Sequence, residues 1–140
     1  MCRYLPDARQ HVVDDAMAKA SHLVVTTLAR TEVTMALQQV IGRPERSSSA
    51  AAVWHRMAID WDRFWIVPLD NQSLHRAAEL AGVFGLNVAN SLHLAALDRL
   101  PRPATLLTFD DRQVAAAVDL GLDIVDVYAA ASTAHGLLRA

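Results

Sequence analysis

Several residue types are scarce in this chain of 140 residues, and each scarcity excludes a class of protein. The only cysteine, Cys2, cannot form a disulfide within the chain, so a disulfide-stabilised scaffold is excluded and a reducing cytoplasm is the expected location. The first thirty residues lack the charged start, apolar stretch and cleavage site of a signal peptide. Charges such as Arg56 and Glu79 interrupt the apolar segments before any reaches about 18 residues, so we expect no membrane span.

Lysine is equally scarce, because twelve of the thirteen basic residues are arginine and only Lys19 is lysine. The formal net charge is −2, which does not indicate a partner by itself. The planar guanidinium group suits phosphate better than a lysine point charge does. A nucleic-acid partner therefore remains open despite the mild acidity.

The length predicts one domain, which we place at residues 1–128, followed by a tail of small residues at 129–140. Segments of helical period alternate with short β-branched segments, which is typical of an α/β domain with a largely parallel sheet. We expect strands at 22–26, 64–68, 104–109 and 123–128, and helices at 28–41, 50–62, 71–81, 88–97 and 110–121. A nucleotide-binding or receiver domain of flavodoxin type is an alternative, but no glycine-rich phosphate loop occurs.

Acidic residues stand at two of the expected element boundaries. Glu32 lies in the first turns of the helix at 28–41, where it is either a solvated acid favoured by the helix dipole or a paired or metal-bound carboxylate. Asp110 and Asp111 follow the strand at 104–109, at the end where parallel sheets place ligands. Asp110 with Gln113 also has the capping-box pattern of a helix start. Capping and metal binding are compatible, because a carboxylate has two oxygens.

Asn90 lies in the first turn of the helix at 88–97, on the same face as Leu94 and Leu97. Its amide therefore points toward the side that the leucines bury. It is either a polar residue of a helix start or an uncharged oxygen ligand. We interpret the neighbouring His93 as structural, because a zinc site needs a second ligand at suitable spacing.

Three motifs occur in a fixed order: Thr31-Glu32-Val33, then Gly85-Leu86 followed by Asn90-Ser91-Leu92-His93, then Leu107-Thr108-Phe109-Asp110-Asp111. From Tyr4 to about Val127, the chain resembles the PIN domains of VapC-type toxins, the metal-dependent ribonucleases of toxin–antitoxin pairs. The resemblance implies a three-layer α/β/α domain with a mainly parallel central sheet. It also implies Mg²⁺ or Mn²⁺ as cofactor, RNA as substrate, an antitoxin protein as partner and a homodimer.

The resemblance assigns roles to individual residues. The catalytic set is Glu32, Asn90 and Asp110, and the metal set is Glu32, Asp110 and Asp111. Arg30 and Arg112 flank two of the acidic motifs and are candidates for RNA contact, with surface or structural pairing as the alternative.

The chain also departs from the family pattern. PIN domains of this type begin with a strand that ends in an aspartate, before a segment like Tyr4-Leu5-Pro6-Asp7, so the N-terminal strand is missing here. Asn90 stands where the family has another aspartate. Either Met1 is an internal start, or a central strand has been lost and its exposed neighbours are covered by oligomerisation or a partner. With two charges fewer, we expect weak metal binding and slow or absent RNA cleavage; the alternative is a catalytically inactive PIN scaffold for homodimer or antitoxin binding.

Overall fold

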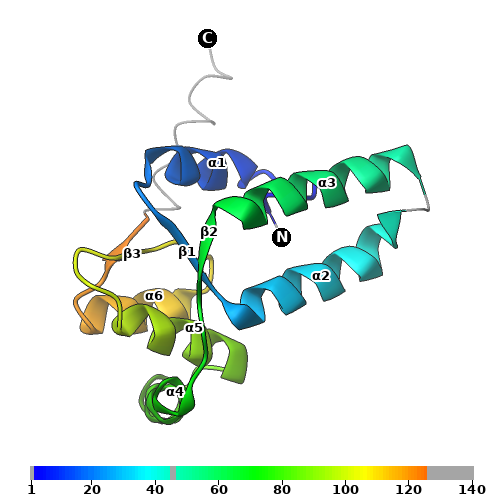
Figure 1. Ribbon diagram of the computed structural model, residues 1–140. Coiled ribbons are helices and arrows are strands. Elements are labelled where there is room, and N and C mark those ends of the chain that lie inside the picture. The colour runs from blue at the N-terminus through cyan, green and yellow to red at the C-terminus, as the bar shows by residue number, and fades with distance from the viewer. Residues whose placement is uncertain (1, 45–46, 126–140) are drawn as a thin grey trace. The chain divides into compact units, whose positions relative to one another are not determined.

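The computed structural model describes residues 2–44 and 47–125, and the chain divides into two compact units at residues 1–67 and 68–140 (Figure 1). The expected mixed α/β class with parallel strands is confirmed, since the described residues form helices and two parallel sheets of two strands each. The tail expected at 129–140 and the end of the strand expected at 123–128 lie outside the described residues.

The first unit contains two strands and three helices among its described residues. In chain order these are α1 (Gln10–Lys19), β1 (Leu23–Thr26), α2 (Thr27–Ile41), α3 (Ser48–Arg63) and β2 (Phe64–Val67). The two strands run parallel, with Leu23 opposite Phe64 and Thr26 opposite Val67. Since α2 and α3 lie between the strands in sequence, β1 and β2 form the crossover unit that parallel pairing requires.

Local capping groups set the ends of these helices. The Thr26 hydroxyl accepts a hydrogen bond from the Ala29 N–H at 3.3 Å and so begins α2, and the Ser47 hydroxyl accepts one from the Ala50 N–H at 3.0 Å to begin α3. Gly42 ends α2 with a positive φ of 73°. Four buried residues form the core of this unit: Tyr4, Leu37, Met57 and Trp61.

The second unit contains α4 (Asn71–Phe84), α5 (Val88–Asp98), β3 (Thr105–Leu106), α6 (Asp111–Asp119) and β4 (Asp123–Ile124) among its described residues. The strands β3 and β4 pair in parallel, with Thr105 opposite Asp123. The core consists of small and branched apolar side chains: Ala77, Leu80, Leu86, Leu94, Ala95, Ala116, Ala117 and Leu122. This core holds α4, α5 and α6 together and so positions the two helix starts described below.

Two sequence predictions need correction. The strand expected at 104–109 is only two residues long, because in the described chain only Thr105 and Leu106 pair with β4. Helix α1 was not predicted, and its weak apolar face explains why, since Val12 is its one buried residue. Within the described residues no single helix is long and apolar enough to span a membrane; α4 and α5 together have the required length and composition but are bent by 117°.

Candidate functional site

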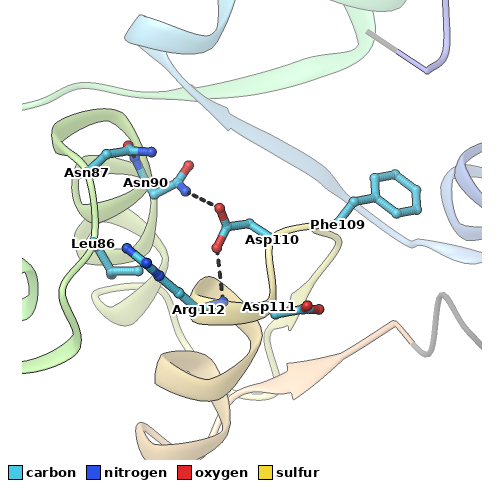
Figure 2. A pocket seen from close by; sticks show the side chains of 7 residues that line it. All are labelled: Leu86, Asn87, Asn90, Phe109, Asp110, Asp111 and Arg112. Carbon is cyan, nitrogen blue, oxygen red and sulfur yellow. Dashed lines mark hydrogen bonds between the residues drawn. The ribbon is translucent and has the colours of Figure 1, made fainter.

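A cleft of about 340 Å³ lies in the second unit, where α5 and α6 both begin (Figure 2). Seven residues line it: Leu86, Asn87, Asn90, Phe109, Asp110, Asp111 and Arg112. Asn87 begins α5 by accepting a hydrogen bond from the Asn90 N–H at 2.8 Å, and Asp110 begins α6. The cap at Asp110 was predicted from the sequence, and both caps depend only on residues two or three positions apart in the chain.

The structure brings together two predicted site residues, Asn90 and Asp110. The Asn90 side-chain N–H donates to Asp110 Oδ2 at 2.9 Å (Figure 2). The other carboxylate oxygen, Oδ1, accepts from the backbone N–H groups of Arg112 and Gln113, each at 3.0 Å. Asp110 therefore caps α6 with one oxygen and ties α6 to α5 with the other.

Gln113 was predicted to complete a capping box with Asp110, and that half of the prediction is wrong. Its side chain is buried and donates to the Asn90 backbone carbonyl at 3.1 Å, while its carbonyl oxygen accepts from the Thr108 hydroxyl at 2.6 Å. The Thr108 hydroxyl in turn accepts from the Asp110 N–H at 3.2 Å, which is the group that a capping box would have satisfied. Through these hydrogen bonds Thr108 and Gln113 hold the backbone of Asp110 and of Asn90 in place.

The other predicted residues of this unit have different surroundings. Asp111 is exposed, and Figure 2 shows its carboxylate directed away from Asn90. The Arg112 guanidinium donates to the Gly85 carbonyl at 3.2 Å and so lines the cleft. His93 is half-buried on α5.

Glu32 and Arg30 belong to α2 in the first unit, so the structure defines no distance between them and the cleft. Glu32 is half-buried. The Arg30 guanidinium carbon lies 5.9 Å from the centre of a Trp61 ring, within the range of a cation–π contact. This contact favours the structural alternative for Arg30.

A buried ion pair in the first unit was not predicted. The Arg3 guanidinium contacts both carboxylate oxygens of Asp60, at 2.9 and 3.0 Å, and also contacts Asp14. Asp60 is only 2% exposed. Burial raises the pKa of Asp60, but hydrogen bonds from Arg3 and from Tyr4 outweigh it and hold that pKa below its usual range. The sequence offered no signal for this pair, because 57 positions separate its members.

The arrangement of the cleft does not fit a divalent cation. Mg²⁺ and Mn²⁺ need carboxylate or carbonyl oxygens with lone pairs directed at the ion. Here Asp110 Oδ1 accepts two backbone N–H groups and Oδ2 faces the N–H group of Asn90, which repels a cation. Over residues 2–44 and 47–125, no group of three or more His, Cys, Asp or Glu side chains is placed to hold a metal ion.

Comparison with protein-family models, with curated proteins and with solved structures finds no match for this chain. Any functional assignment therefore rests on its own motifs and geometry. Within the second unit these point to one place, the cleft at the start of α5 and α6.

Proposed function

We propose that this chain is a PIN-like protein of the VapC toxin type whose metal-dependent endoribonuclease activity is impaired. The three-layer arrangement with a mainly parallel central sheet is part of the proposal. The observation that carries it is the hydrogen bond between Asn90 and Asp110, 2.9 Å long. Two motifs singled out by the resemblance, twenty positions apart, meet in one cleft, as a shared site requires.

The strand pairs also support the proposal. The described strands form two parallel pairs, β1 with β2 in the first unit and β3 with β4 in the second, and parallel pairing is what the proposed sheet requires. Parallel sheets are normally covered on both faces. Trp65 is 62% exposed and Ile66 is 45% exposed on β2, so apolar sheet surface is available for the homodimer or antitoxin contacts in the proposal.

The proposed impairment of RNA cleavage follows from the missing negative charge at Asn90. The proposed activity is hydrolysis of RNA phosphodiesters, and Mg²⁺ or Mn²⁺ would bind weakly because it has to displace the N–H group of Asn90 from Asp110. Glu32, Asn90 and Asp110 are the proposed catalytic residues, with Asp111 as an additional ligand and Arg112 as an RNA contact. Asn90 contributes no charge, and its N–H group already satisfies Asp110. We therefore expect the cation to bind weakly and RNA cleavage to be slow.

The second candidate is a catalytically inactive PIN scaffold that forms a homodimer or holds an antitoxin. The hydrogen bonding of Asp110 favours it, because both carboxylate oxygens already have N–H partners within the protein. The two candidates share a fold and partners. They differ in whether the chain cleaves RNA.

The deciding experiment is cleavage of a structured RNA by the chain with Mg²⁺ or Mn²⁺, beside Glu32→Gln. The matched control is Glu79→Gln, which makes the same chemical change at an exposed position of α4. Slow cleavage that is lost only in Glu32→Gln supports the impaired enzyme, and silence in every sample supports the scaffold. Cleavage equal in all three proteins indicates a contaminating nuclease. Fast cleavage lost in Glu32→Gln would contradict the impairment.

A further inference from the structure

Asp110 is the acidic residue around which the cleft is built, and its two carboxylate oxygens accept three N–H groups of the protein. We infer that the side-chain N–H of Asn90 takes the place of a divalent cation beside Asp110. The cleft then holds a neutral donor where a metal would lie, and cation binding has to displace that donor. The interpretation of the cleft as a former metal site rests on the proposed function.

The carboxylate of Asp110 determines the orientation of the Asn90 side-chain amide. Its nitrogen lies 2.9 Å from Asp110 Oδ2, which is hydrogen-bond distance. Rotating the amide by half a turn would bring two acceptor oxygens to the same distance, an arrangement that needs a cation between them. A cation that approaches Oδ2 from the side of Asn90 therefore has to displace this hydrogen bond.

The position of Asn90 is held independently of that amide. The buried Gln113 donates to the Asn90 backbone carbonyl at 3.1 Å, and the Asn90 N–H donates to the Asn87 side chain at 2.8 Å. Neither bond involves the Asn90 side chain. A different side chain at this position therefore begins from the same backbone location beside Asp110.

The strength of the hydrogen bond between Asn90 and Asp110 sets how much it weakens cation binding. A hydrogen bond to a charged group contributes an amount that corresponds to roughly a ten- to hundredfold change in an equilibrium constant. Breaking the Asn90 bond weakens cation binding by that factor. Asn90→Asp removes the competing donor and adds a charged ligand, so its affinity for Mn²⁺ should exceed that of the unaltered chain by at least this factor.

The experiment measures Mn²⁺ binding directly, by the loss of the electron paramagnetic resonance signal of free Mn²⁺ and by the rise in thermal unfolding midpoint. We expect saturable binding in Asn90→Asp and at least tenfold weaker binding in the unaltered chain. Asn71→Asp, which adds the same charge at the exposed start of α4, is the matched control and should bind like the unaltered chain. Equal affinity in the unaltered chain and Asn90→Asp would overturn the inference.

Asn90→Ala keeps the test decisive if Asn90→Asp does not fold. Removing the donor without adding charge should strengthen Mn²⁺ binding at Asp110 if Asn90 competes with the ion, and weaken it if Asn90 is a ligand. The second result would overturn the inference. RNA cleavage is scored separately. Asn90→Asp that binds Mn²⁺ but cleaves no RNA would contradict the proposed function alone. Slow Mn²⁺-dependent cleavage by the unaltered chain, with equal Mn²⁺ affinity in the unaltered chain and Asn90→Asp, would contradict this inference alone.

Discussion

Replacing Asp60 by asparagine tests the buried ion pair of the first unit. Asp60 is almost fully buried and receives two hydrogen bonds from the Arg3 guanidinium. Asparagine has nearly the same shape but no charge, and its NH₂ group faces the Arg3 donors. The substitution therefore leaves the Arg3 cation without its main partner while changing packing very little.

The expected loss in the free energy of unfolding is about 3 kcal/mol. Removing one member of a buried ion pair costs about 3–5 kcal/mol, because the remaining charge stays buried without compensation. We expect the lower end of that range for two reasons. The Arg3 side chain is 19% exposed to water, and it retains Asp14 as a second partner.

Urea unfolding followed by tryptophan fluorescence measures this loss in the first unit. All three tryptophans, Trp54, Trp61 and Trp65, belong to that unit. With a denaturant dependence of about 1–3 kcal/mol per molar urea, a loss of about 3 kcal/mol lowers the midpoint by roughly 1–3 M. Far-UV circular dichroism follows the helices of both units and shows whether the second unit unfolds at the same midpoint.

Asp62→Asn is the matched control, since it makes the same change at an exposed position of the same helix, α3. A surface substitution of this kind should change the free energy of unfolding by no more than about 0.5 kcal/mol. A loss below about 1 kcal/mol in Asp60→Asn, or the same loss in both variants, would refute the reasoning that the buried pair stabilises this unit.

Other predictions concern the second unit. Hydrogen bonds from the Arg99 guanidinium and the Ser73 N–H lower the pKa of Asp70 to about 2. Its ionised form therefore stabilises the fold above the unfolded pKa of about 3.9, and this contribution is lost as the pH falls toward about 2. In acid titrations followed by circular dichroism, Asp70→Asn should flatten this pH dependence, and an unchanged curve would contradict the assignment. Gly85 ends α4 with a positive φ of 64°, so Gly85→Ala should cost about 1–2 kcal/mol in urea unfolding. Gly82→Ala, inside α4 with nothing within 4 Å of the added carbon, should instead add about 1 kcal/mol, and changes of the same sign in both variants would contradict this account.

Helix starts were predictable from the sequence because the interactions that form them are local. The sequence offers Thr26 or Thr27, Asp70 or Asn71, Asn87 and Asp110 as helix caps. In the structure the side chains of Thr26, Asp70, Asn87 and Asp110 each accept a hydrogen bond from a backbone N–H three positions ahead. The necessary groups are adjacent in the chain whatever the rest of the fold does. Gly85, with its positive φ, ends α4 by an equally local interaction, although this helix runs to Phe84, past the end expected at residue 81.

Strand length was not predictable from local composition. The segment at 104–109 combines apolar residues with two threonines, as strands often do, yet β3 consists of Thr105 and Leu106 among the described residues. A strand extends only where a neighbour offers backbone partners, and within residues 47–125 β4 offers Asp123 and Ile124 as partners. The partner therefore decides where the strand ends.

The sequence by itself determined the α/β class, the helix caps and the residue types of the candidate site. Tertiary structure decided what those residues do: packing of α5 against α6 places the Asn90 amide on Asp110, twenty positions away, and Gln113 on Thr108 and Asn90. It also joined Arg3 to Asp60 across 57 positions. Such contacts depend on how whole helices pack, because a side chain's partner in space is set by the core beneath its helix and not by its neighbours in the chain.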